Sequence, residues 1–298
     1  MPDHVKPSDW KRLLVPEKPS PEEERTVSEV KAIREELRQR PGVVEIPDLK
    51  AANRHGTPES DQLAQTTVPW RRLVDQASVT EASGRLLFRV ATAVGAGTAI
   101  EVGTCLGISS SWIAAALARD ADPKMVCLDG APNLLAVAQQ NVERVGGFKA
   151  ELRPGLFSDT VAKAVAELDV IDFAYVDGEH FYEPTIRDAH LLLPKLRDGG
   201  AIVFDDIGWN AEMQMAWRSL ANHPLCALAI EPRHCGSRCF GVIVKGDNHH
   251  PGRIVVVDDF PVVPQWGWSV VRRIMPGRAL RGARTLKRAL QRPAVMTG

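Results

Sequence analysis

The chain has 298 residues, 44% of them hydrophobic and 25% charged, which is ordinary for a globular protein with a sizeable core. Basic and acidic residues number 37 each, so no excess charge selects nucleic acid or an acidic partner. No stretch approaches the roughly 20 apolar residues that span a bilayer, and the N-terminus lacks a signal-peptide core. Because the five cysteines are odd in number and form no disulfide framework, we expect a reduced, cytoplasmic protein.

Residues 1–75 are rich in proline and charge and contain one clear helix signal. Ser20 is a suitable N-cap, Pro21 suits the first helical position, and Glu23 completes a capping box. Four apolar residues follow at helical spacing, before a Pro-Gly stop: Val27, Val30, Ile33 and Leu37. We expect residues 1–75 to form a helical arm or lid, not an independent core.

Residues 76–246 alternate short apolar runs with helical patterns. Five runs read as buried strands: TAIEVG, KMVCLD, FKAELR, IDFAYVDG and GAIVFDD. A helix at 211–220 and two further strands, at 225–230 and in CFGVIVKG, come next. Alternating strands and helices indicate right-handed βαβ units. The fold class is therefore α/β, a doubly wound, mostly parallel seven-stranded sheet with an antiparallel last strand.

Residues 247–298 are expected to be a C-terminal extension with a basic tail. From residue 265 onward the tail carries eight basic residues and no acidic one. Two interpretations stay open: weak contact with an anionic membrane surface, or a solvated tail that could also serve as a contact in a homo-oligomer.

The segment RHCGSRCF also has two interpretations. His234, Cys235 and Cys239 could belong to a zinc site, but a closed zinc site needs four ligands and no further Cys or His pair has suitable spacing. We therefore favour a Gly-Ser turn between two strands.

The end of the first strand of the 76–246 region is built to approach a ligand. Glu101, Gly103, Thr104, Gly107 and Ser109 lie between this strand and a helix whose N-terminal N–H groups suit an anion. The second strand ends at Asp129, where a carboxylate can accept both ribose hydroxyls of an adenosine group. A nicotinamide cofactor would also fit such features, but the turn lacks the GxGxxG spacing of a dinucleotide site.

Three carboxylates are predicted to meet where the fourth and fifth strands end. Asp177 follows the fourth strand, and Asp205 and Asp206 follow the fifth. Three such groups repel one another unless protons or a cation neutralise them, and oxygen ligands suit Mg²⁺. A simpler interpretation, a helix-capping aspartate, explains only one of them. His180, three residues after Asp177, is placed to remove a hydroxyl proton near the cation.

Three segments resemble, in order and spacing, the class I S-adenosylmethionine-dependent methyltransferases. They are IEVGTCLGISS, VCLDGAP and VDGEHFYEPTIRDAHLLLPKLRDGGAIVFDDI. The nearest groups are the metal-dependent O-methyltransferases of the catechol and caffeoyl-CoA type and the bacterial sugar and antibiotic O-methyltransferases. The similarity covers residues 78–245.

The resemblance implies roles for individual residues. Glu101, Gly103 and Ser109 would hold the methionine part of S-adenosylmethionine, and Asp129 its ribose. Thr104 and Gly107 would also bind the cofactor. Asp177 would lie beside both cofactor and acceptor. The adenine pocket would involve Gly155, Phe157 and Ser158. Mg²⁺ would be bound by Asp177, Asp205 and Asp206. Catechol-type enzymes have Asn and Lys where this chain has Asp206 and His180, which indicates the bacterial branch.

The resulting hypothesis is an O-methyltransferase that acts on a hydroxyl of a small molecule, such as a sugar, a polyol, a phenol or a natural product. Its acceptor would be shaped by the N-terminal arm and by aromatic residues after the fourth and fifth strands. Two other functions stay open at this point: a nicotinamide-dependent oxidoreductase, and a non-catalytic adenosine-binding or peripheral membrane protein.

Overall fold

The structure is a computed structural model that describes residues 7–48, 64–232, 239–246 and 254–257. Its main feature is an eight-stranded sheet, and a separate sheet has two strands. In chain order the strands of the large sheet are β3 (Thr98–Val102), β4 (Lys124–Asp129), β5 (Glu151–Pro154), β6 (Ile171–Val176), β7 (Leu196–Phe204), β8 (Cys226–Pro232), β9 (Gly241–Lys245) and β10 (Ile254–Val257).

The strand order confirms the doubly wound topology. It runs β10-β8-β9-β7-β6-β3-β4-β5, and every neighbouring pair is parallel except those that β9 makes with β7 and β8. The chain moves outward from β3 in one direction and from β6 in the other. The topological switch point, where doubly wound sheets bind ligands, therefore lies between the carboxyl ends of β3 and β6.

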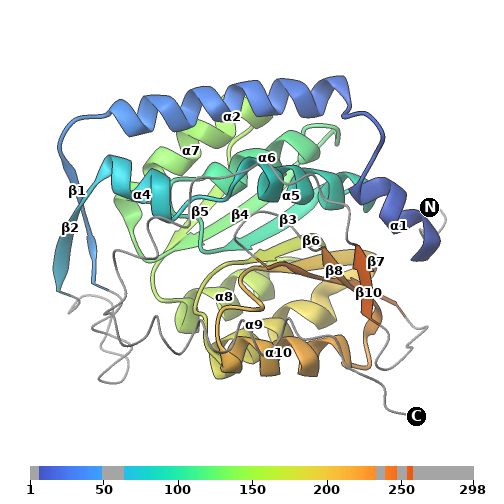
Figure 1. Ribbon diagram of the computed structural model, residues 1–298. Helices are drawn as coiled ribbons and strands as arrows, with labels where there is room; N and C mark the ends of the chain where they lie inside the picture. Colours follow the sequence, from blue (N-terminus) through green and yellow to red (C-terminus); the bar gives the residue numbers. More distant parts are fainter. Residues whose placement is uncertain (1–6, 49–63, 233–238, 247–253, 258–298) are drawn as a thin grey trace, which may run out of the picture. The chain divides into compact units, whose positions relative to one another are not determined.

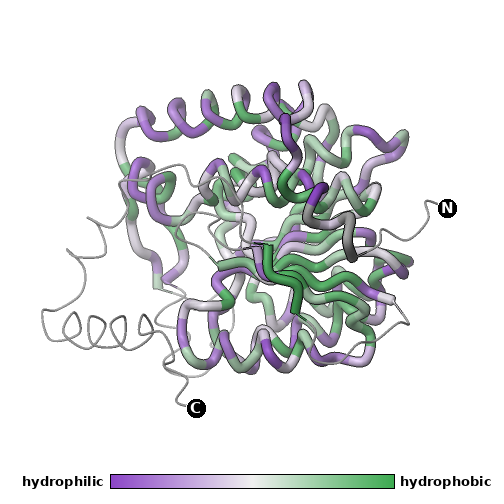
Figure 2. Tube along the Cα trace, turned by 45° about the vertical axis from the view of Figure 1, so that its right-hand side comes forward, coloured by the Kyte–Doolittle hydropathy of each residue, from purple (hydrophilic) through white to green (hydrophobic). Residues whose placement is uncertain are grey.

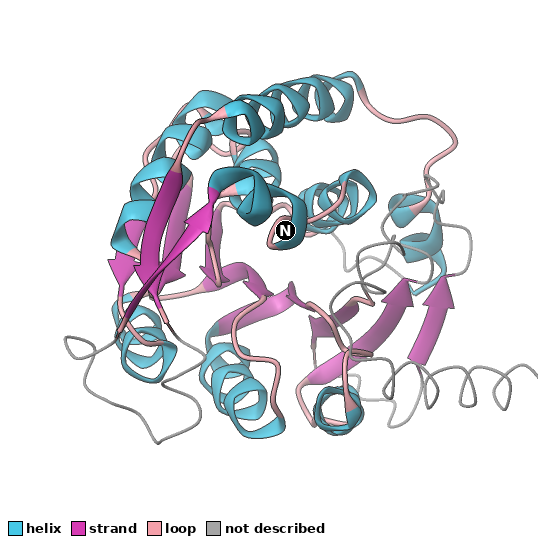
Figure 3. Ribbon diagram, turned by 60° about the vertical axis from the view of Figure 1, so that its left-hand side comes forward, coloured by secondary structure: helices cyan, strands magenta, loops and turns pink. Residues whose placement is uncertain are grey.

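Helices cover both faces of the large sheet (Figures 1 and 3). In chain order the helices are α1 (Pro7–Leu14), α2 (Pro21–Gln39), α4 (Trp70–Gln76), α5 (Glu81–Ala93), α6 (Ile108–Leu117), α7 (Pro132–Gly146), α8 (Phe157–Glu167), α9 (Tyr182–Lys195) and α10 (Ala211–Ala221). Helices α5, α6 and α7 share one apolar cluster with the sheet, and α8, α9 and α10 share the other. The strands between these layers are strongly apolar (Figure 2).

Helix α2 forms as the sequence predicts. The Ser20 hydroxyl accepts a hydrogen bond from the N–H of Glu23 at 3.1 Å, and Pro21 is the first helical residue. The predicted apolar positions are buried: Val27, Val30, Ile33 and Leu37. They belong to the cluster on the α5–α7 side of the sheet, so α2 adds an outer layer to that side (Figure 1).

A buried group of charges also fixes α2 to α5. Arg89 donates from Nε to Glu23 Oε2 at 3.1 Å and from Nη2 to Glu23 Oε1 at 2.7 Å. The same guanidinium donates to the carbonyl of Leu14 at 2.7 Å, and Arg85 bonds to Glu23 at 2.7 Å. Arg89 and Glu23 are both buried, so this bidentate pair is shielded from solvent.

Several elements were not expected from the sequence. Strands β1 (Val43–Pro47) and β2 (Gln65–Pro69) pair antiparallel as the separate two-stranded sheet, and α1 and α4 are short additional helices. Strand β10 adds an eighth, parallel strand beside β8, so the large sheet extends past residue 246. Strand β5 begins three residues later than predicted, and β7 begins four residues earlier.

Other predictions lie outside the described residues or stay untested. The turn at 233–238 and the basic tail are among the residues that the structure does not describe. The chain divides into two units after Val262, and the second unit is not described. The domain limits at residues 75 and 246 remain predictions. In the described ranges, no helix has the length and apolar character to cross a bilayer.

Candidate functional site

The candidate site lies at the carboxyl ends of β3, β4, β6 and β7. The turn after β3 is fixed by two glycines with left-handed backbone, Gly103 at φ 97° and Gly107 at φ 72°. A Cβ atom on Gly103 would lie 2.0 Å from the Asp177 carbonyl oxygen, and one on Gly107 would lie 2.6 Å from Ala138 Cα. Both positions therefore exclude any side chain, and Gly103 brings the turn against the strand end that carries Asp177.

Asp129 joins the turns that follow β3 and β4. Its Oδ2 accepts a hydrogen bond from the Cys105 N–H at 2.7 Å, and its Oδ1 accepts one from Ala131 at 2.9 Å. Burial raises the pKa of Asp129, and these two donors act in the opposite direction. The Asp129 carbonyl also accepts the Gly155 N–H at 3.0 Å, so the predicted ribose and adenine residues adjoin each other. Their contacts with a cofactor remain a prediction.

Glu101 lies beneath this turn and is fully buried. Its Oε2 accepts a hydrogen bond from the hydroxyl of Ser110 in α6. Burial raises the pKa of Glu101 to about 8, and the nearby hydroxyls of Ser109, Ser110 and Thr104 oppose that shift. The carboxyl group is thus mostly protonated at neutral pH, and it links β3 to the start of α6. The sequence did not single out Ser110, because a Ser-Ser-Ser run gives no signal for which hydroxyl turns inward.

The predicted adenine residues are only partly brought to the site. Gly155 has a φ of 139° and precedes α8, which begins at Phe157. Phe157 packs beside Gly178 at the end of β6, since a Cβ on Gly178 would lie 3.1 Å from the Phe157 ring. Ser158 is exposed, and its hydroxyl bonds to the neighbouring Asp159 at 3.3 Å.

The carboxylates after β6 and β7 gather around one imidazole. His180 Nε2 lies 3.3 Å from Asp177 Oδ1 and 3.7 Å from Asp206 Oδ2. The Asp177 and Asp206 side chains keep 13% and 18% of their surface exposed, whereas Asp205 has none. Asp177, Asp206 and His180 therefore form the accessible part of this group, and Asp205 lies beneath it.

His180 is electrostatically coupled to these aspartates. Burial by itself would lower its pKa, but the close approach of Asp177 and the charges of Asp206 and Asp205 outweigh this and raise the pKa above 6.5. Nε2 is buried, and no described residue partners it with hydrogen-bond geometry. Because Nε2 lies in ion-pair range of both carboxylates, it can exchange a proton with a polar group that binds beside them.

A divalent cation fits the chemistry of this group, although the ligands are not already arranged around a common point. No set of three or more His, Cys, Asp or Glu side chains in the described part of the chain has the arrangement of a metal site. Two partly exposed carboxylates nevertheless suit Mg²⁺, which commonly keeps several water ligands and takes only one or two carboxylates from the protein.

The sequence analysis missed Tyr175, a buried residue of β6. Its hydroxyl donates to Asp205 Oδ2 at 2.9 Å and lies 3.2 Å from Asp177 Oδ2. The sequence did contain a signal for it. Alternate residues of a strand share a face, so Tyr175 is expected on the same side of the sheet as Asp177.

Comparison with known proteins bears on this site directly. Residues 100–207 match the family model described as a methyltransferase domain. The matched range begins in β3 and ends just after β7, so it includes all four strand ends of the site. Over these residues the chain is similar to a methyltransferase domain.

Two relatives agree with the methyltransferase domain. A catechol O-methyltransferase of Niastella koreensis is 29% identical over 132 residues, which are 44% of this chain and 58% of that protein. A putative O-methyltransferase of Mycobacterium marinum is 28% identical over 158 residues, 52% of this chain and 68% of that protein. The chain thus spans less than two thirds of the length of the first of these relatives.

A solved structure supports the fold. The O-methyltransferase from Bacillus cereus, in complex with SAH, superposes with a TM-score of 0.51 and 19% identity, over 80% of this chain and 97% of that chain. The resemblance and the fold class expected from the sequence are confirmed for the methyltransferase domain. The comparisons also favour a methyltransferase over a nicotinamide-dependent oxidoreductase. The roles of individual residues, the cation and the acceptor remain predictions.

Proposed function

We propose that this chain is an S-adenosylmethionine-dependent O-methyltransferase that methylates a hydroxyl group of a small molecule with the help of a divalent cation. The observation that supports it most is the position of Asp177. Its backbone carbonyl packs against Gly103 of the turn after β3, while its carboxylate lies 3.3 Å from His180. Asp177 thus joins the predicted cofactor turn to the cluster of carboxylates around His180.

The cofactor would be held by the turns after β3, β4 and β5. Gly103, Thr104, Gly107 and Ser109 border the methionine side, Asp129 the ribose, and Gly155, Phe157 and Ser158 the adenine. Glu101 acts from below, because its enclosed carboxyl group orients the start of α6. When bound, the cofactor supplies an activated methyl group on a sulfonium.

The cluster of carboxylates around His180 would orient the acceptor. Asp177 and Asp206 would hold the cation, which when bound would raise the acidity of an acceptor hydroxyl. His180 Nε2 takes the hydroxyl proton as the oxygen forms its bond to the methyl carbon and the sulfur–carbon bond breaks. Holding the oxygen in line with that bond can supply several kcal/mol of the rate enhancement.

The acceptor class is supported by the site and its relatives together. His180 and Asp206 replace the Lys and Asn of catechol-type enzymes, which favours the bacterial branch, so sugars and polyols should be tested as acceptors alongside phenols. Exposed aromatic residues border the site after β6 and β7: Phe181 and Trp209. They offer flat apolar surface to a ring-shaped acceptor.

Calorimetric titration with S-adenosylmethionine, with and without Mg²⁺, followed by a methyl-transfer screen on phenols, sugars and polyols, tests the proposal. We expect cofactor binding in both conditions and transfer only with the cation. Absence of cofactor binding would refute the proposed activity, and transfer that persists in a chelator would remove only the cation from it. His180→Gln should bind cofactor normally and lose transfer.

A further inference from the structure

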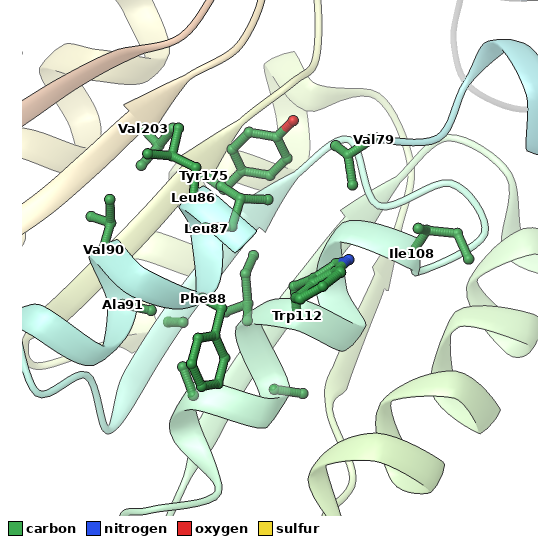
Figure 4. Close-up of a cluster of buried hydrophobic side chains, with 14 of the residues drawn as sticks. Val79, Leu86, Leu87, Phe88, Val90, Ala91, Ile108, Trp112, Tyr175 and Val203 are labelled. Atoms are coloured by element: carbon green, nitrogen blue, oxygen red, sulfur yellow. The ribbon is translucent and has the colours of Figure 1, made fainter. Parts of the chain in front are cut away.

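Tyr175 lies beneath the cluster of carboxylates around His180, and its ring packs in an apolar cluster. The side chain is fully buried, and its ring centroid lies 6.3 Å from that of Phe240. Figure 4 shows the ring near Val203 and Leu86, with the hydroxyl oxygen pointing away from the apolar side chains. A phenylalanine would fill the same apolar space, so packing alone does not account for the hydroxyl, which needs a polar partner when buried.

The Tyr175 hydroxyl lies within hydrogen-bond distance of two carboxylates, and Asp205 is the nearer one. The donor–acceptor distance to Asp205 Oδ2 is 2.9 Å, shorter than the 3.2 Å to Asp177 Oδ2. The other Asp205 oxygen, Oδ1, accepts the backbone N–H of Asp206 at 2.7 Å. Since Asp205 is fully buried, both of its carboxylate oxygens engage the protein from below the accessible group.

The residue that Asp205 holds has an uncommon backbone conformation. Asp206 has a φ of 51°, in the left-handed region that few residues other than glycine adopt. Such a conformation persists at a functional site when its surroundings enforce it. Here the Asp206 N–H is held by Asp205, and the Asp206 carbonyl accepts the Trp209 N–H at 2.8 Å. The Asp206 carboxylate is thereby presented to His180.

We propose that Tyr175 is a positioning residue: its hydroxyl holds the Asp205 carboxylate inward, and Asp205 in turn holds the left-handed Asp206 turn that presents the second accessible carboxylate. This inference rests on the proposed function, because it assigns the cation to Asp177 and Asp206. Asp205, which the sequence resemblance implied as a third ligand, becomes the support of that pair. Residues that orient metal ligands typically change metal affinity about 10- to 100-fold when they are replaced.

The first test compares Mn²⁺ binding to the full chain and to Tyr175→Phe, which keeps the ring and removes the hydroxyl. We expect Mn²⁺ affinity to fall about 10-fold or more, with S-adenosylmethionine affinity within about twofold of wild type, which is under ~0.5 kcal/mol. Tyr182→Phe is the matched control, because Tyr182 is the chain's other tyrosine and its hydroxyl lies 3.5 Å from Ser219 rather than near a carboxylate. It should leave Mn²⁺ affinity unchanged.

A second measurement works without any metal. Hydrogen exchange of residues 204–210 reports the Asp206 and Trp209 amides, which both donate hydrogen bonds in this turn. Tyr175→Phe should accelerate their exchange, and Tyr182→Phe should not. If wild-type protein binds no Mn²⁺ but Tyr175→Phe still accelerates exchange, the cation is removed from the proposed function and the positioning role is supported. Unchanged exchange in Tyr175→Phe would overturn that role.

The Asp205 and Asp206 variants separate support from ligation. Asp206→Asn should lose more Mn²⁺ affinity than Asp205→Asn, because only Asp206 is proposed to face the cation. In the double variant Tyr175→Phe/Asp205→Asn, the loss should be smaller than the sum of the two single losses, since both substitutions disrupt the Tyr175–Asp205 contact. An Asp205→Asn loss equal to that of Asp206→Asn, or fully additive losses, contradicts the proposal.

Discussion

The two halves of the site differ in how they accommodate their acidic side chains. In the cofactor half, defined by the turns after β3 and β4, Glu101 is enclosed and stays mostly protonated, since its pKa is raised to about 8. In the acceptor half, defined by the turns after β6 and β7, Asp177 and Asp206 lie against His180, whose pKa they raise. In the cofactor half, burial keeps the Glu101 carboxyl group uncharged. In the acceptor half, the negative charges of Asp177 and Asp206 face an imidazole that can carry a positive charge.

The halves also differ in what fixes their backbone. Glycines without room for a Cβ atom determine the cofactor turn, whereas hydrogen bonds between side chains and backbone hold the Asp206 turn. The cofactor half should therefore be sensitive to added volume, and the acceptor half to the loss of single charges or hydroxyls at constant volume.

Gly103→Ala should have the largest effect. The added Cβ would meet the backbone oxygen of Asp177 at 2.0 Å, and φ at this residue is 97°. Since neither backbone can move easily, we expect a loss of more than about 4 kcal/mol of unfolding free energy, or no folding. Gly95→Ala is the control, with a φ of 61° and no neighbour within 4 Å, and should lose only about 1–2 kcal/mol. Urea denaturation measures both.

Asp206→Asn should reduce methyl transfer about 10-fold while cofactor affinity stays near the wild-type value, because the amide oxygen can still ligate a cation but lacks the negative charge. Asparagine matches the volume and tolerates the left-handed backbone, so only the charge changes. Asp198→Asn, at an exposed residue of β7, is the matched control and should keep full activity. Steady-state kinetics with a responsive acceptor measures the change. A parallel loss of cofactor affinity would erase the distinction between the halves.

Glu101→Gln should flatten the pH dependence of stability. The folded-state pKa of about 8 exceeds the ordinary value of 4.5, so the folded protein holds a proton that the unfolded chain has released. This contribution is complete below pH 4.5 and is lost as the pH rises toward 8, by up to about 1.4 kcal/mol per pH unit. Urea unfolding at several pH values should show this slope in wild type and in the exposed-site control Glu183→Gln, and a smaller one in Glu101→Gln.

Trp209→Ala should have the smallest effect on the protein itself. The side chain is 70% exposed, so unfolding free energy should change by less than about 0.5 kcal/mol. If a ring-shaped acceptor packs on it, its KM should rise about 3- to 10-fold, because aromatic pairs contribute roughly 0.5–1.5 kcal/mol. Val170→Ala, an exposed apolar residue before β6 at the other edge of the sheet, is the control and should keep the wild-type KM.

Periodicity and turn chemistry predicted the parts of the fold that depend on local sequence. Helix α2 begins at Ser20 and buries the expected apolar face, and the strands that end at Asp129 and before Asp177 and Asp205 were found because buried parallel strands are continuously apolar. Strand β10 was missed although Ile254–Val257 is a continuously apolar, β-branched run, because the sheet was expected to end by residue 246. Strands β1 and β2 depend instead on a partner distant in sequence.

The site was predictable to the level of residue type and strand end. Gly103, Asp129, Asp177 and His180 adjoin one another's turns as the sequence analysis expected. The sequence could not show that Asp205 turns inward while Asp206 turns outward. Two adjacent aspartates are equivalent until the backbone of the second becomes left-handed, and that depends on the Tyr175 hydroxyl from a neighbouring strand.

The buried Arg89–Glu23 pair has a consequence for how an acceptor could enter. Lifting α1 and α2 together would separate Leu14 and Glu23 from the Arg89 guanidinium and expose four apolar side chains of α2 to water. Breaking a buried ion pair alone costs roughly 3–5 kcal/mol. The first helices should consequently move together with the sheet, so α1 and α2 would not open and close over the site as a lid.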